Sequence, residues 1–365
     1  MTDKWQNIRI RGKIPTLINR NKKMPNPHLI KISILASPDS TASTLFGLFD
    51  VLSTVGIGWE KFVTWESVSP RFDVRIVALG EEPFQCGNAM VTPHCSIYDA
   101  EDTDIAIISS FAVPGLVLRE HDERELEWLI RLQSQGTTIG AVCTAVSLLA
   151  ESKLIDGLEA TCFWAYSDLV RGHYPKVRWR TDQNLCRSGS DDQFVTVGGT
   201  TSWQELALYL ILRYCGVEAA AQTAKFWVIP DRGESQAPYS VKSMKPLHED
   251  SIIEECQTWI AERFYNPNPI AGMIEHTGLA QTTFMRRFKR ATGERPMDYV
   301  HMLRIEKAKA MLESSNDAID EIGHVVGYDD PASFRRIFKR KVSLTPSAYR
   351  QKFGYARFDR YGVEC

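Results

Sequence analysis

The chain repeats one seventeen-residue pattern near its C-terminus at an interval of fifty residues, and no other feature of the sequence constrains the fold as strongly. The two copies are FMRRFKRATGERPMDYV at 284–300 and FRRIFKRKVSLTPSAYR at 334–350. Each follows a short helical pattern and a turn glycine, Gly278 or Gly327, and each contains a proline that halts its helix. The repeat predicts two helix-turn-helix units, in which the phenylalanines pack inward and the Arg and Lys side chains point outward.

A third helix, expected over 297–313, would hold the two units at a fixed separation. The net charge of the whole chain is −2, from 43 basic and 45 acidic residues among 365, and by itself it gives no reason to expect binding to nucleic acid. Between Arg286 and Arg357, however, sixteen basic residues face nine acidic ones. A charged helix face is often only a solvated face, but two such units in tandem favour helices that enter successive major grooves of DNA.

These residues resemble the AraC/XylS family of transcription regulators over roughly 250–353, most closely at Ile319–Ile322, Gly327–Tyr328, Phe334–Lys339 and Pro346–Arg350. The resemblance implies base contacts from one set of positions in each unit and phosphate contacts beside them, with guanine bound bidentately by Arg286 and Arg336. The implied base-facing residues are Thr282, Met285 and Arg286 in the first unit and Ala332, Arg335 and Arg336 in the second, and the phosphate-facing residues are Gln281 and Lys339.

Three positions depart from the family pattern. Ala280 stands where a capping Ser is common, which would remove a cap worth ~1 kcal/mol. Gly323 replaces an Ala inside a helix, at a cost of up to ~1 kcal/mol, and Ser343 stands where a Gly usually ends the helix. We expect these changes to loosen the domain without removing its DNA-facing side chains.

The N-terminal half alternates short apolar runs with helical patterns, which favours a parallel sheet covered on both faces. We expect strands at 29–36, 72–80, 104–111, 137–142, 176–180 and 193–199, and helices at 44–56, 120–135, 145–154 and 202–216. The fold class is therefore an α/β sandwich of flavodoxin-like type, followed by an all-α domain.

Cys143 lies where an expected strand runs directly into a helix, as nucleophiles do at sharp strand-to-helix elbows. The following helix N-terminus would favour the thiolate and lower the pKa of the thiol. The alternative is that Cys143 is simply a small buried apolar side chain.

Further residues in this half resemble the class I glutamine amidotransferase-like domain that precedes AraC-type modules in regulators of the GlxA type. They are KLIDGL at 153–158, Thr161 with Phe163-Trp164, and Val197–Thr200, within a match over about 29–229. The resemblance implies a pocket near Asp50, Cys143, Thr144 and Trp164. Phe163 stands where catalytic relatives have a histidine, and His94, His121 and His173 match no such position, so we expect a ligand sensor that lost its chemistry.

We expect a basic arm at 1–27, a sensor domain at 28–230, a linker at 231–249, a DNA-binding domain at 250–355 and a tail at 356–365. The eight cysteines show no zinc-ligand spacing, so we expect reduced thiols, no metal, no cofactor and a cytoplasmic location. No apolar run in the sequence is long enough to span a membrane, and the polar, basic N-terminus leads us to expect no signal peptide.

Three functions remain open on the sequence. The first is a one-component regulator that binds double-stranded DNA and a small metabolite, amino acid or nitrogenous, acts as a homodimer and contacts RNA polymerase. The second is a cysteine hydrolase or amidase with an appended DNA-binding domain. The third is a DNA-binding scaffold that answers to protein partners.

Overall fold

Apolar runs rich in β-branched residues form the centre of a seven-stranded sheet in the computed structural model, which describes residues 29–112, 115, 117–241 and 248–354. The strand order is β10-β11-β7-β6-β1-β2-β5, and neighbouring strands are parallel except for the β10–β11 pair. The predicted parallel α/β sheet is therefore confirmed. Its strands are β1 (Ile30–Leu35), β2 (Phe72–Ala78), β5 (Cys95–Ser96), β6 (Ile105–Ile108), β7 (Thr138–Val142), β10 (Leu185–Ser188) and β11 (Phe194–Val197).

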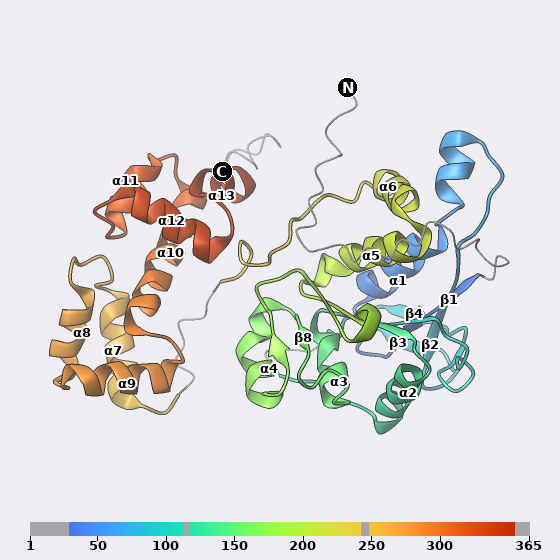
Figure 1. The fold of residues 1–365 in the computed structure, drawn as a ribbon, viewed down its shortest axis with the longest axis horizontal. Helices are drawn as coiled ribbons and strands as arrows, with labels where there is room; N and C mark the ends of the chain where they lie inside the picture. The colour runs from blue at the N-terminus through green and yellow to red at the C-terminus, as the bar shows by residue number, and fades with distance from the viewer. Residues whose placement is uncertain (1–28, 113–114, 116, 242–247, 355–365) are drawn as a thin grey trace.

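Helices cover both faces of the sheet (Figure 1). On one face, α1 (Ala42–Ser53), α5 (Trp203–Cys215) and α6 (Val217–Phe226) enclose one apolar core. On the other, α2 (Glu123–Ser134), α3 (Val146–Glu151) and α4 (Ser167–His173) enclose a second core, which is built around the fully buried Trp128. Side chains alternate between these cores along β1, so that Ile32 and Ile34 enter the first and Leu35 enters the second.

Two short strand pairs lie outside the main sheet. β3 (Phe84–Cys86) pairs with β4 (Ala89–Val91), and β8 (Glu159–Ala160) pairs with β9 (Arg178–Trp179). The strand expected at 176–180 is thus reduced to two residues in a separate ladder. A π-helical turn at Glu60–Thr64 lies in the connection between α1 and β2.

In the C-terminal half, every described secondary-structure element is a helix, and the helices enclose two apolar cores. The 19-residue helix α10 runs through both cores and joins them, as the sequence predicts. The helices are α7 (Ser251–Ala261), α8 (Pro269–Thr277), α9 (Gln281–Thr292), α10 (Pro296–Ser314), α11 (Ile319–Val325), α12 (Pro331–Val342) and α13 (Pro346–Phe353).

The predicted basic arm at 1–27 and the tail at 356–365 lie outside the described residues. No helix in the described part of the chain is long and apolar enough to cross a membrane. The described residues contain no group of three or more His, Cys, Asp or Glu side chains that could hold a metal ion. The seven described cysteines are free thiols.

Candidate ligand pocket and nucleic-acid interface

Cys143 forms the strand-to-helix junction that the sequence predicts. β7 ends at Val142, and a 3₁₀ turn over Cys143–Ala145 leads into α3. The backbone of Cys143 has a φ of 60°, in the left-handed region that residues with a side chain rarely adopt. Such a conformation persists only where the surrounding structure enforces it, and it is typical of functional turns.

A pocket of about 400 Å³ opens around this junction at the carboxyl ends of the parallel strands. Loops that follow β1, β6, β7 and β11 supply most of its walls, as expected for ligand sites in open α/β sheets. The Thr144 hydroxyl ties two of these loops together, because it accepts from the Phe111 amide at 3.1 Å and donates to the Phe111 carbonyl at 2.8 Å. The lining residues are Thr41, Ser110, Phe111, Ala112, Gly115, Cys143, Thr144, Phe163, Tyr166 and Thr200.

The thiol in this pocket is held in its protonated form. Cys143 is only 3% exposed, and burial raises the pKa of its thiol. Hydrogen bonding favours the thiolate but acts more weakly than burial, and the Thr200 hydroxyl lies 3.6 Å from the sulfur. The predicted lowering of this pKa is therefore wrong, since the loss of water around the sulfur outweighs the hydrogen bonds that favour the thiolate.

Phe163 lines the pocket with Cys143, so an aromatic ring lies where catalytic relatives would supply a base. Of the three histidines named in the sequence analysis, His121 contacts α3, the helix that follows Cys143, because its Nε2 lies 3.0 Å from Ser147 Oγ. Burial, together with the nearby Arg119, lowers the pKa of His121 to about 4. His94 Nδ1 accepts the Ile76 amide, and His173 Nδ1 lies 3.2 Å from the Leu169 carbonyl.

Two of the four predicted pocket residues do not line this pocket. Asp50 is exposed, because the buried positions of α1 include Leu48, Val51 and Leu52, which place residue 50 on the solvent side. Trp164 packs its ring against Phe163, with centroids 5.1 Å apart, while Phe163 itself reaches the pocket. Sequence reasoning missed Thr41, Ser110 and Thr200, although each lies within a few residues of a strand's carboxyl end.

The first half of the predicted linker is packed against the α/β domain. Gln236 is 2% exposed, and its Nε2 lies 2.9 Å from the carbonyl oxygens of Cys162 and Gln183. The backbone amide of Gln236 donates to the Asp182 carbonyl at 2.9 Å, and Glu234 accepts from the Asn184 amide at 2.9 Å. We call residues 234–240 the docked segment.

The docked segment also contacts the helical half. The rings of Tyr239 and Phe353 meet edge to face with centroids 5.3 Å apart, and Lys352 Nζ lies 4.7 Å from the Tyr239 ring centroid. Lys309 on α10 donates to the Ser240 carbonyl. Seven residues therefore connect α10 and α13 to backbone groups next to Phe163 in the ligand pocket.

The first helix-turn-helix unit consists of α8 and α9, with Gly278 in the left-handed turn between them. Phe284 and Phe288 of α9 are fully buried. The four residues implied to face DNA on this helix are all exposed, namely Gln281, Thr282, Met285 and Arg286. As expected, Ala280 provides no side-chain cap for α9.

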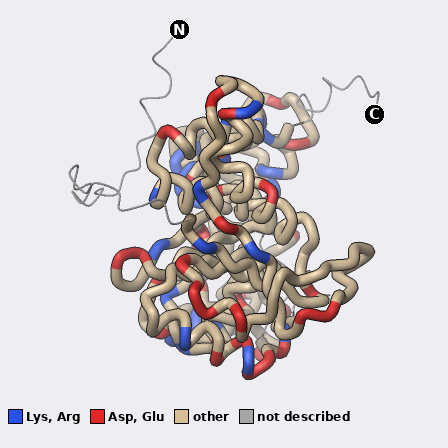
Figure 2. Tube along the Cα trace, turned by 90° about the vertical axis from the view of Figure 1, so that its right-hand side faces the viewer, with Lys and Arg blue, Asp and Glu red and all other residues tan. Residues whose placement is uncertain are grey.

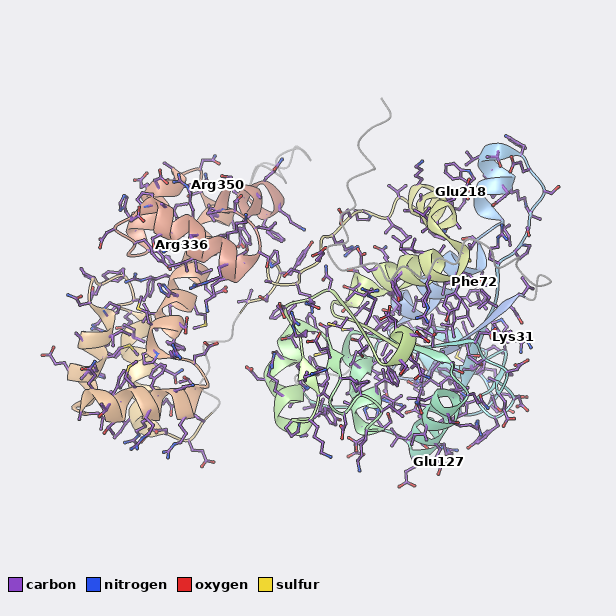
Figure 3. All side chains as sticks on the ribbon, in the orientation of Figure 1. Lys31, Phe72, Glu127, Glu218, Arg336 and Arg350 are labelled. Carbon is purple, nitrogen blue, oxygen red and sulfur yellow. The ribbon has the colours of Figure 1, made fainter. Side chains whose placement is uncertain are left out.

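The second unit consists of α11 and α12, and Gly327 has a φ of 94° in its turn. Its four implied DNA-facing residues are also exposed, namely Ala332, Arg335, Arg336 and Lys339. Figure 3 labels Arg336 on α12, and Figure 2 marks the basic and acidic residues along the chain. Arg335 forms an ion pair with Asp320 of α11, and Ser343 ends α12 with a φ of 64°.

Comparisons with known proteins match both halves. Residues 53–212 match the family model of the DJ-1/PfpI family, and residues 273–352 match that of a helix-turn-helix domain. The chain is similar to the HTH-type transcriptional regulator CdhR of Pseudomonas aeruginosa, with 25% identity covering 65% of this chain and 70% of that protein. It is also similar to the HTH-type transcriptional regulator GlxA of Rhizobium meliloti. These two sequences are 24% identical, and the match covers 62% of this chain and 69% of that protein.

Two solved structures are each similar to about half of this chain. Drosophila melanogaster DJ-1beta is 17% identical, with a TM-score of 0.46, and the match covers 56% of this chain and all of that one. An AraC family transcriptional regulator from Pseudomonas putida is 12% identical, with a TM-score of 0.44, and the match covers 54% of this chain and 99% of that one.

Proposed function

We propose that this chain, which joins a DJ-1/PfpI domain to an AraC-type helix-turn-helix domain, is a transcription regulator that binds specific DNA sequences and senses a small molecule. The observation that carries the proposal is the pair of helices α9 and α12, which bury matching phenylalanines and expose matching arginines. If α9 and α12 enter successive major grooves of the DNA, Arg286 on α9 and Arg336 on α12 can each bind the edge of a guanine base. Gln281 and Lys339 would contact phosphates and fix the register.

A mobility-shift titration in moderate salt tests this proposal on DNA fragments from upstream of the neighbouring genes. We expect the full chain to bind at least one fragment in preference to unrelated DNA. Arg286→Ala and Arg336→Ala should each weaken that preference by about 1–3 kcal/mol, whereas Arg124→Ala, an exposed arginine on α2, should leave it unchanged. Equal affinity for all fragments would refute sequence-specific binding.

We infer that the pocket around Cys143 binds the effector and carries out no acyl transfer. Among the described residues that line the pocket, none is a base that could activate the buried thiol beside Phe163. CdhR and GlxA, two relatives that this chain is similar to, are named as transcriptional regulators, which also favours sensing over the alternative of a cysteine hydrolase. Alkylation of Cys143 by iodoacetamide should therefore accelerate only above pH ~8.5, whereas a fast rate that is already constant at pH ~7 would favour the hydrolase.

The docked segment offers a route by which the effector would alter DNA binding. Gln236 contacts backbone oxygens beside Phe163, and Tyr239 contacts α13. A ligand that favours one arrangement of the pocket walls would thus bias the position of the second unit by population shift. The amino-acid or nitrogenous nature of that ligand remains our prediction from the resemblance.

We further propose that the chain acts as a cytoplasmic homodimer that contacts RNA polymerase. Sedimentation velocity at micromolar concentration tests the dimer directly. A single species of 41.4 kDa across the concentration range would refute it.

A further inference from the structure

The turn of the second helix-turn-helix unit packs directly against the loop at 262–268, which joins α7 to the first unit. A Cβ on Gly327 would lie 2.6 Å from the Tyr265 carbonyl oxygen and 2.7 Å from the Tyr265 Cα, so a glycine is required at this close approach. By contrast, a Cβ on Gly278, the turn glycine of the first unit, would meet none of the described residues within 4 Å apart from its chain neighbours. The second turn is thus placed by a contact with the first unit's loop.

Arg304 of α10 holds the same loop from the other side. Its side chain is buried, with 5% exposed. Its Nε donates to the Phe264 carbonyl at 2.7 Å, and its Nη2 donates to the Asn266 carbonyl at 2.9 Å. A buried charge is costly unless hydrogen bonds replace the water that it has lost. These two bonds therefore favour the arrangement in which the loop stays against α10.

The same guanidinium group also contacts the second unit. It lies 5.2 Å from the ring centroid of Tyr328, the residue that follows the turn glycine. The Tyr328 ring packs on Phe334 of α12 with centroids 5.5 Å apart, and on its neighbour His301 of α10 with nearly parallel rings. One side chain on α10 thus connects the loop of the first unit to the aromatic residues beneath α12. We call Arg304, with its contacts to this loop and to Tyr328, the Arg304 bridge.

The position of α12 relative to α9 determines which spacing of DNA elements both helices can reach. One base pair added between two elements moves the second by about 3.4 Å along the DNA axis and turns it by roughly 35°. The helices α9 and α12 pack into separate apolar cores, so their relative position depends on what joins those cores. The helix α10 is one connection, and the Arg304 bridge is a second one that links the loop and the turn directly.

We propose that the Arg304 bridge sets the number of base pairs between the two DNA elements that this chain accepts. The inference rests on the regulator function proposed above. Arg304 acts here as a positioning residue, because its guanidinium group is buried between the units and reaches DNA only through the placement of α12. Loosening the bridge should therefore relax the choice of spacing while the base-facing side chains stay in place.

The test compares binding of the full chain to its selected DNA site with binding to the same site carrying two inserted base pairs, which turn the second element by roughly 70°. We expect the wild type to prefer the uninserted site roughly tenfold or more. Arg304→Met and Gly327→Ala should each reduce this preference at least fivefold. Gly278→Ala introduces a methyl group at the other turn glycine, also at positive φ but in open space, and should keep the preference. A smaller folded fraction weakens binding to both duplexes by the same factor, so the preference reports position and not stability.

A third duplex, in which the second element is scrambled, distinguishes a displaced second unit from an unfolded one. Scrambling should still weaken binding by Arg304→Met at least fivefold, because α12 continues to read its element. The inference is overturned if both variants keep the wild-type preference for spacing, or if both lose it together with all dependence on the second element, since the bridge would then only fold the second unit. A wild type without any sequence preference would instead refute the proposed regulator function, and the inference with it.

Discussion

Two adjacent glycines allow the docked segment to be perturbed with a matched control. A Cβ added to Gly198 would lie 2.0 Å from Gln236 Nε2 and 2.2 Å from its Cδ, so Gln236 cannot keep its position in Gly198→Ala. A Cβ added to Gly199 would lie 3.2 Å from Ser202 Oγ at its nearest approach, and Gly199 already has an ordinary φ of −67°. We therefore expect Gly198→Ala to release the docked segment and Gly199→Ala to leave it in place.

The magnitude follows from the contacts of the Gln236 amide. Its nitrogen lies within 2.9–3.2 Å of four oxygens, from Thr161, Cys162, Thr181 and Gln183. An amide NH₂ group has two hydrogens, so two of these contacts at a time are full hydrogen bonds worth about 1 kcal/mol each. Losing both lowers the stability of the docked state by about 2 kcal/mol, which is a roughly 30-fold shift in its equilibrium.

Hydrogen exchange measures this shift at two backbone amides. The Gln236 amide donates to Asp182 and the Asn184 amide donates to Glu234, so both are protected only while the segment is docked. Their exchange should accelerate roughly 30-fold in Gly198→Ala and remain unchanged in Gly199→Ala. The double variant Gly198→Ala, Gln236→Ala should exchange no faster than Gln236→Ala alone, because the clash is gone. Wild-type exchange rates in Gly198→Ala would refute the reasoning.

Two further predictions concern stability. Gly323→Ala should lower stability to urea by about 1–3 kcal/mol despite its better helix propensity, because the new Cβ would lie 3.0 Å from Phe334 Cδ1; a more stable variant would contradict this. We expect the protein to lose stability as the pH falls below neutral, because of His121. The pKa of His121 is about 4 in the folded protein and about 6.5 in the unfolded chain, so the unfolded chain binds the proton at a higher pH and is favoured by acid. The contribution is complete above pH ~6.5, and about 2 to 3 kcal/mol of it is lost by pH ~4.5. In urea titrations across this range His121→Gln should show a correspondingly smaller loss, and an identical loss in both proteins would exclude His121 as the cause.

The parts of the molecule that were predictable from the sequence are those specified by local periodicity. The helical repeat places Phe284 and Phe334 inside and Arg286 and Arg336 outside, because a side chain's direction on an amphipathic helix follows from its position alone. The same holds for Cys143, whose junction lies directly between a strand run and a helical run.

The wrong or missing predictions depend on contacts between distant segments. The pKa of Cys143 rises because loops from several strands exclude water from the sulfur, which its neighbours in sequence do not reveal. Gln236 lies in a polar stretch typical of a linker, and the oxygens that hold it come from residues 161–183. Gly323, which the sequence predicts to be a weak point, lies where an added methyl group would come within 3.0 Å of the Phe334 ring, so that the ring would have to shift.

The central claim is that two helix-turn-helix units of one chain bind one face of specific DNA. Selection of binding sequences from random duplexes by the full chain tests it most directly. We expect an enriched site with two conserved elements about 10–10.5 base pairs apart, and binding should weaken strongly when about 5 base pairs are inserted between them, because the second element turns to the opposite face. Absence of any enriched sequence, or binding that is indifferent to the insertion, would contradict the claim.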